Sequence, residues 1–175
     1  MLDFSRNHYD LFGLPPRFRL DAAALEDAWR RLQSDVHPDR HAAGSDADRR
    51  AALQASARVN EAYRALKDPV QRAQYLLSLN GVDAVAETDT QLPLDFLERQ
   101  LERREEASDA LANEDERALA SLRDSVRAEA KDLEDELVRE LDASRDFGKA
   151  KPRVRELTFL AKLADDIDAM AASLD

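Results

Sequence analysis

The tripeptide His37-Pro38-Asp39 holds the side chains of this sequence best suited to chemistry, and His41 follows it closely. An imidazole and a carboxylate can bind a metal ion together, but metal sites usually need roughly three or four ligands, and His8 is the one other histidine. A His–Asp pair can also activate a nucleophile, although the sequence offers no obvious one. The third interpretation is a turn in which the proline stops a helix and the aspartate bonds to the nearby backbone.

Two amphipathic helices must flank this tripeptide. The first is expected to begin after Asp21, a good N-cap, and to place its apolar residues on one face: Leu25, Trp29, Leu32 and Val36. Burial of that face leaves Arg30 and Arg31 toward solvent. The second begins at Ser45 or Asp46, and it carries the apolar residues Leu53, Val59, Ala62, Tyr63 and Leu66. Pro69 then fits the first turn of a further short helix.

A second group of helices follows Asn80-Gly81, and we expect a domain boundary near residue 80, with residues 80–93 as a linker. Residues 94–175 show three long helical patterns. The first opens with Leu94, Leu97 and Leu101. The second runs from Leu119 to Leu141 with apolar residues spaced by about 3.67 on average, as in a nearly straight helix. Gly148 and Pro152 are expected to separate it from the third, so that the three close as an antiparallel bundle.

The composition excludes several classes of protein. With 36% charged residues, 4 glycines and 6 prolines, the chain is rich in helix formers and poor in turn residues, which predicts an all-α fold. The lack of cysteine excludes disulfides, thiolate nucleophiles and iron–sulfur clusters held by the chain itself. No apolar run approaches the roughly 20 residues of a membrane span, and residues 1–8 lack the hydrophobic region of a signal peptide. We therefore expect a cytoplasmic protein without a membrane partner.

The net charge of −11 is unevenly distributed. Residues 1–79 hold 12 basic and 11 acidic side chains, whereas residues 80–175 hold 14 and 26. Because phosphate-backbone binding needs clustered lysine and arginine, the acidic half argues against a nucleic-acid partner. It leaves room for basic protein partners.

Three segments of the first half resemble the J-domain, the module that activates chaperones of the seventy-kilodalton heat-shock class. They read NHYDLFGLP, AWRRLQSDVHPDR and RVNEAYRALKDPVQRAQYLL. This resemblance implies that residues 1–79 form a short first helix and an antiparallel helix pair, joined by a loop that carries the His-Pro-Asp motif. The core is then expected to contain Tyr9, Leu11, Phe12, Leu32, Val59, Tyr63 and Leu66.

The chain as a whole is similar to HscB, the family of J-type co-chaperones of iron–sulfur cluster assembly. The segments that carry this similarity are GLPPRFRLDAAAL, RAQYLLSLNG, DFLERQLERREE and VRELTFLAKL. It implies an L-shaped, two-domain protein that is not an enzyme and holds neither cofactor nor metal. The J-domain would dock on the chaperone HscA and accelerate its ATP hydrolysis, while residues 94–175 would carry the scaffold IscU. The zinc-binding cysteines of mitochondrial relatives are absent, which favours a bacterial form.

The resemblance also implies which residues meet the chaperone: His37, Pro38, Asp39, Arg30 and Arg31. Physically, Pro38 fixes the backbone while Asp39 can accept charge-assisted hydrogen bonds from an arginine of the partner. One departure is acidic: general J-domains often carry lysine or arginine on this helix where the present chain has Glu26, Asp27 and Asp35. The less positive surface predicts a dedicated chaperone rather than the general housekeeping one.

The scaffold contact is expected to be an apolar patch on the bundle, rimmed by charge. The resemblance assigns the apolar part to Leu97, Leu101 and Phe159, and the rim to Glu102, Arg104 and Glu105. Glu98 and Thr158 depart from the family, since an apolar and a basic residue are expected there. The alternative is that the three apolar residues belong to the core of the bundle.

Two other functions stay open from the sequence alone. One is a J-domain co-chaperone that delivers a different client protein through the acidic bundle. The other is a metal-dependent enzyme that uses His37, Asp39 and His41. A monomer is expected in solution, because no sustained heptad seam is left over once the bundle is built.

Overall fold

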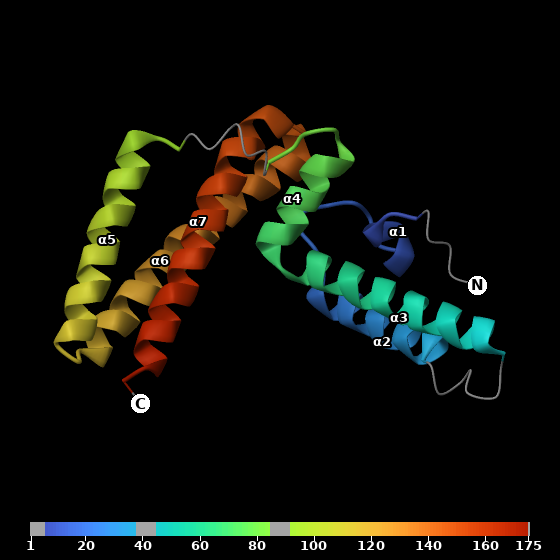
Figure 1. Ribbon diagram of the computed structural model, residues 1–175. Helices are drawn as coiled ribbons and strands as arrows, with labels where there is room; N and C mark the ends of the chain where they lie inside the picture. The colour runs from blue at the N-terminus through green and yellow to red at the C-terminus, as the bar shows by residue number, and fades with distance from the viewer. Residues whose placement is uncertain (1–5, 38–44, 85–91, 175) are drawn as a thin grey trace. The chain divides into compact units, whose positions relative to one another are not determined.

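The computed structural model describes residues 6–37, 45–84 and 92–174, and this part of the chain is helical without a strand (Figure 1). The chain divides into two compact units at Leu76/Leu77, within helix α4 (Pro69–Leu79). The sequence placed this boundary near residue 80. Pro38 and Asp39 of the expected tripeptide, and residues 85–91 of the expected linker, lie outside the described residues.

The first unit is built on an antiparallel pair, α2 (Ala22–Val36) and α3 (Asp46–Lys67), with the short helix α1 (His8–Phe12) packed against both. Asp21 caps α2 as expected, since its Oδ1 accepts hydrogen bonds from the backbone N–H groups of Ala23 and Ala24 at 3.0 and 3.1 Å. Ser45 caps α3 in a capping box with Asp48. Pro69 opens α4 as expected.

The core of this unit follows the expected pattern with four differences. Tyr9, Phe12, Val59 and Leu66 are buried, while Leu11, Leu32 and Tyr63 are half-buried. Leu53 was expected among the core-facing residues of its helix, but it is 57% exposed, because six positions at 100° per residue place it about 120° away from Val59.

Phe18 is a core residue that helical periodicity did not indicate. It is 1% exposed and lies in the irregular segment between α1 and α2, with the guanidinium of Arg72 5.0 Å from the centre of its ring.

The second unit contains three packed helices: α5 (Leu94–Ala112), α6 (Glu116–Leu137) and α7 (Phe147–Ala172). Helix α6 continues into a π-helical turn, η2 (Val138–Ser144). The apolar stripe expected from Leu119 to Leu141 supplies buried residues from both elements, and α7 faces it with a long buried stripe from Ala150 to Ile167. These two helices form the larger part of the bundle core.

The expected break at Gly148 and Pro152 is wrong, because both residues lie inside α7. The chain turns earlier, at Arg145, whose φ of 54° is left-handed, and Asp146 then caps α7 by accepting a hydrogen bond from the backbone N–H of Lys149 at 3.1 Å. A proline within a helix removes one backbone hydrogen bond. Burial of Ala150 and Val154, on either side of Pro152, outweighs that loss.

Candidate partner-binding surfaces

His37 ends helix α2 with its side chain exposed to solvent. Its backbone is extended, with φ of −61° and ψ of 129°, as is usual for the residue before a proline. The imidazole therefore lies at a solvent-exposed end of α2. Pro38, Asp39 and His41 lie outside the described residues, so the structure does not place the rest of the motif.

Arg30 and Arg31 lie on the solvent face of α2, as the apolar spacing of that helix predicted. They differ in their surroundings. The guanidinium of Arg30 forms an ion pair with the carboxylate of Glu26, one helical turn earlier, whereas Arg31 forms no ion pair with any residue that the structure describes. Glu26, one of the acidic departures noted above, thus offsets part of the positive charge on this face.

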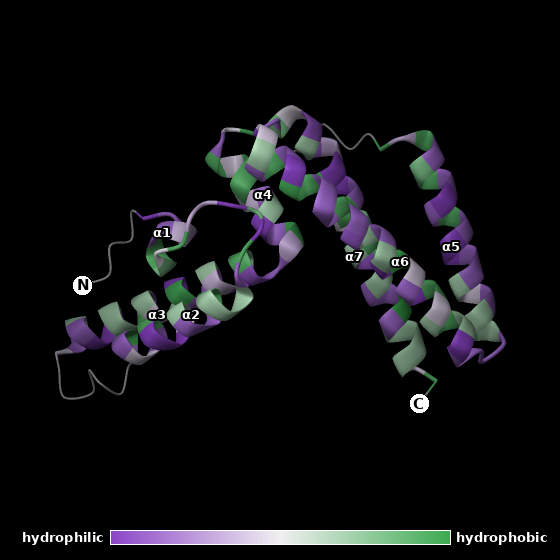
Figure 2. Ribbon diagram, turned by 180° about the vertical axis from the view of Figure 1, so that it is seen from behind, coloured by the Kyte–Doolittle hydropathy of each residue, from purple (hydrophilic) through white to green (hydrophobic). Residues whose placement is uncertain are grey.

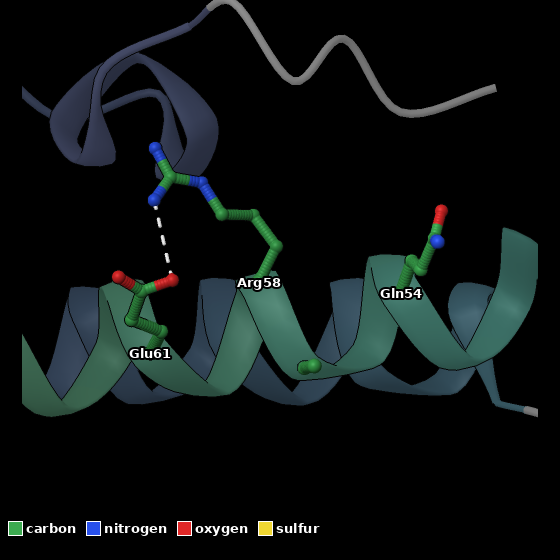
Figure 3. A pocket seen from close by; sticks show the side chains of 4 residues that line it. Gln54, Arg58 and Glu61 are labelled. Atoms are coloured by element: carbon green, nitrogen blue, oxygen red, sulfur yellow. Dashed lines mark hydrogen bonds and ion pairs between the residues drawn. The ribbon is translucent and has the colours of Figure 1, made fainter.

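Two hollows lie along α3. The first, of about 360 Å³, is lined by Gln54, Ala57, Arg58 and Glu61. Figure 3 shows Arg58 reaching across to Glu61, and their ion pair measures 3.3 Å. Because these two charged groups already satisfy each other, the hollow does not offer the converging free groups of an active site.

The second hollow, of about 470 Å³, is lined in part by His8, Asn60 and Arg64. His8 is 6% exposed, its ring stacks on Tyr75 with centroids 4.0 Å apart, and its backbone N–H donates to the Tyr75 hydroxyl at 2.9 Å. Burial lowers the pKa of His8, and the positive charge of Arg58 lowers it further. A neutral imidazole in this stack is a structural group of the first unit.

Helix α5 has two distinct faces. Its inward face consists of residues spaced by 4, 3, 4 and 3 positions: Phe96, Gln100, Arg103, Ala107 and Ala110. Its outward face carries the leucines, and Leu94, Leu97 and Leu101 are 71%, 40% and 60% exposed. Figure 2 shows hydrophobic segments among hydrophilic ones along this helix. Leu97 and Leu101 are thus surface residues, and the alternative that placed them in the bundle core is wrong.

Phe159 of α7 is half-buried at the edge of the same helix pair. Its ring meets that of Phe96 edge to face, with centroids 5.8 Å apart. The guanidinium of Arg104 lies 5.2 Å from the centre of the Phe159 ring, a cation–π contact. The structure therefore brings Arg104 and Phe159 together.

The charged residues expected around the patch are on the surface. Glu102, Arg104 and Glu105 are all exposed on α5, and so is Glu98. Thr158 is exposed too, and its hydroxyl donates to the Val154 carbonyl at 2.7 Å. Leu94 was not assigned to this patch from the sequence, although its spacing of three from Leu97 puts it on the same face.

The described residues hold no group of three His, Asp or Glu side chains placed to bind a metal ion. None of the helices in this part of the chain is both long and apolar enough to cross a membrane.

Comparison with known proteins connects these two surfaces to one family. Residues 7–75 match the DnaJ domain model, and residues 92–168 match the HscB C-terminal oligomerisation domain model. The co-chaperone protein HscB homolog of Chromobacterium violaceum is 50% identical over 174 residues, covering 99% of this chain and 98% of the relative. The homolog of Burkholderia vietnamiensis is 45% identical over 175 residues, which cover 100% of this chain and 99% of that one.

Solved structures agree with this. The chaperone HscB from Vibrio cholerae superposes with a TM-score of 0.85 at 37% identity, over 97% of this chain and 100% of that one. Human HscB superposes with a TM-score of 0.88 at 28% identity, over 95% of this chain and 83% of the human one. Members of the HscB family are J-domain co-chaperones, which act with a chaperone of the seventy-kilodalton heat-shock class and are not enzymes. Because this chain has the J-domain, the C-terminal helices and the full-length sequence identity of that family, it belongs to the HscB family.

Proposed function

We propose that this protein binds the iron–sulfur scaffold IscU through the outward face of α5 and delivers it to the chaperone HscA, whose ATPase the J-domain stimulates. The protein then works as an adaptor. It lowers no chemical barrier itself, and its effect comes from bringing the scaffold and the chaperone together in one complex.

The observation that carries this proposal is the orientation of α5. Burial of apolar side chains is the main favourable term in folding, so a helix normally turns its leucines inward. In this helix three leucines are exposed, while a glutamine is buried beside Phe96 and two alanines. A line of exposed leucines rimmed by Glu102, Arg104 and Glu105 has the composition of a protein-binding surface, apolar at its centre and charged at its edge.

The chaperone end rests on the exposed end of α2. We propose that His37, Pro38 and Asp39 contact HscA together with Arg30 and Arg31. An exposed imidazole beside a proline offers a rigid polar group, and a guanidinium pairs well with carboxylates. Since Arg30 already forms an ion pair with Glu26, we propose that Arg31 attracts a carboxylate of the partner more strongly.

We place this activity in the cytoplasm, because the chaperone that it serves consumes ATP. We also propose that the protein works as a monomer. The matched C-terminal model is described as an oligomerisation domain, so the mass in solution is a separate measurement, taken up in the Discussion.

The test is the steady-state ATPase of HscA, with this protein and IscU added separately and together. The expected result is modest stimulation by this protein alone and a clearly larger, more than additive stimulation when both are present. Stimulation that ignores IscU would retain the J-domain role and point to another client protein, the second candidate. Absence of any stimulation would contradict the proposed function at the chaperone end.

The departure at Glu98 has its own test. We propose that a basic side chain of the scaffold faces this carboxylate, so Glu98→Lys is expected to weaken IscU binding. Unchanged or tighter binding of that variant would show that no such compensation exists.

A further inference from the structure

The inward face of α5 is polar where a bundle helix is normally apolar. Between Phe96 at one end and Ala107 at the other, the two residues that face the bundle are Gln100 and Arg103. Gln100 is 1% exposed, and the side chain of Arg103 is 17% exposed. Burying an amide and a guanidinium is unfavourable unless other groups satisfy them, so their partners decide whether this face stays inside.

One carboxylate of α6 pairs with the guanidinium of Arg103, whereas the buried Nε2 of Gln100 has no hydrogen-bond partner among the described residues. Glu129 Oε2 lies 2.5 Å from Arg103 Nη1, and Glu129 Oε1 lies 3.8 Å from Nη2 of Arg99, one turn away on α5. Arg103 also donates to Oε1 of Gln100 at 3.2 Å. Glu129 thus joins two arginines of α5 and, through Arg103, the buried glutamine.

Among the residues that the structure describes, no other acid forms an ion pair with Arg103. Glu156 of α7 is half-buried nearby, and its pKa is raised, chiefly by burial and in part by the negative charges of Glu129 and Asp95. It forms no ion pair with Arg99 or Arg103, although Arg99 partly offsets the rise in its pKa. Asp95 pairs with Arg99 at 3.3 Å but lies exposed on α5 itself. The half-buried Arg103 therefore depends on Glu129 for its counter-ion.

The two faces of α5 compete for the interior. At 100° per residue, the inward stripe and the leucine stripe are centred roughly 120° apart around the helix. Apolar burial alone favours a rotation that brings Leu94, Leu97 and Leu101 inward, since the inward stripe offers just one large apolar residue, Phe96. Something more specific than hydrophobicity must hold the observed orientation.

We infer that Glu129, Arg103 and Gln100 form a polar lock that fixes the rotation of α5 and thereby keeps Leu97 and Leu101 facing outward for the client. They are positioning residues, since they lie on the inward side of the helix and leave the client-binding face to others. The inference rests on the proposed function for the identity of the client, while the lock itself concerns the fold of the bundle.

The rotation can be measured with thiol probes, because the chain has no cysteine of its own. Leu94→Cys places a thiol on the outward face, and Ala107→Cys places one on the inward face, where the alanine is 1% exposed. With the lock intact, the thiol at position 94 is expected to react at least about tenfold faster with a soluble thiol reagent than the one at position 107. In a Glu129→Leu background this order is expected to reverse.

Three outcomes separate the possibilities. Reversal of the two rates supports the inference. Unchanged rates in the Glu129→Leu background would overturn it, because α5 would keep its orientation without the carboxylate. Fast reaction at both positions would also overturn it, since that result indicates detachment of α5 and not rotation.

A double-mutant cycle distinguishes the lock from general damage to the bundle. Glu129→Leu alone leaves Arg103 half-buried without its counter-ion and is expected to weaken IscU binding by about tenfold or more. Arg103→Leu alone leaves Glu129 paired with Arg99 and is expected to have a smaller effect. Combining both substitutions removes the unpaired charge and places a second large apolar side chain on the inward stripe, at position 103, so apolar burial then favours the observed orientation. Binding is expected to return to within about threefold of the unaltered protein. Failure of the double variant to recover would contradict the lock.

The control is Asp135→Asn, also on α6, which removes the exposed carboxylate that pairs with Lys131 at 3.0 Å. It is expected to change neither the thiol rates nor the affinity for IscU. If the unaltered protein fails to bind IscU, the proposed function is wrong, and the thiol rates still decide whether the lock exists.

Discussion

His37 is the exposed imidazole that the described residues place at the end of α2. We predict that His37→Gln loses most of the stimulation of the HscA ATPase, by about tenfold or more, because glutamine keeps a hydrogen-bonding group but not the ring geometry. Helix content by circular dichroism and affinity for IscU should stay unchanged, since His37 is exposed at the end of α2 and is not among the residues proposed to bind IscU. A loss of helix content in this variant would assign the residue a structural role instead.

The buried His8 predicts a pH dependence. Its pKa is lowered in the folded protein by burial and by Arg58, so the unfolded chain binds a proton more readily. The contribution of neutral His8 to the free energy of unfolding is therefore fully present above the ordinary histidine pKa of about 6.5. This contribution is lost as the pH falls from there through the lower pKa of the folded state.

We predict that His8→Phe, which keeps a ring for the stack on Tyr75, makes the free energy of unfolding less dependent on pH in this range. Urea unfolding between about pH 7.5 and pH 5 measures it. The unaltered protein, measured in parallel, gives the slope for comparison. An equal slope in His8→Phe would locate the pH dependence elsewhere.

At the scale of the helix, the outward stripe of α5 predicts where binding energy lies. Replacing Leu97 and Leu101 together by alanine is expected to weaken IscU binding by about 10- to 100-fold, since a few apolar residues usually carry most of an interface. The fold should be unaffected because both side chains are exposed. Leu53→Ala removes an equally exposed leucine from α3 and serves as control. Equal affinity of the double variant and the control would rule out this stripe as the client site.

The capping box at the start of α3 predicts a local contribution to stability. Ser45 Oγ accepts the backbone N–H of Asp48 at 3.2 Å, while the Asp48 carboxylate accepts from the Ser45 N–H at 3.0 Å. Ser45→Ala is expected to cost about 1 kcal/mol, measured by chemical unfolding. Ser34→Ala, at an exposed position inside α2, should leave stability within about 0.5 kcal/mol. A result of similar size for both would mean that the box contributes nothing.

The starts of helices were predictable because capping is a local property. Asp21, Ser45 and Pro69 each act within one turn of chain, so spacing and residue type were sufficient. The start of α7 was not predictable in the same way. Gly148 and Pro152 disfavour helix locally, and the buried stripe that overrides them depends on packing against α6.

The orientation of α5 marks the limit of sequence reasoning for the candidate site. Leu97 and Leu101 share a face by their spacing alone, but Phe96, Ala107 and Ala110 form a second regular stripe on the same helix. Periodicity cannot decide which stripe is buried. The decision depends on Glu129, 26 positions beyond Arg103 and on another helix, which no local pattern connects to it.

At the scale of the whole molecule, the expected monomer has a direct test. We predict that light scattering coupled to size exclusion gives the mass of one 175-residue chain at micromolar concentration. A dimeric mass that returns to monomeric in the Leu97 and Leu101 double variant would instead assign the outward stripe to contact between copies. In that case the client would have to compete with a second copy of the chain.

The exposed leucines of α5 have a consequence for the behaviour of the purified protein. A row of apolar side chains on a small protein promotes association, and the net charge of −11, concentrated in residues 80–175, opposes it by mutual repulsion. Added salt screens that repulsion without weakening the apolar attraction. The protein should therefore aggregate more readily as the ionic strength rises. Binding of the client, which covers the exposed leucines, should suppress this aggregation.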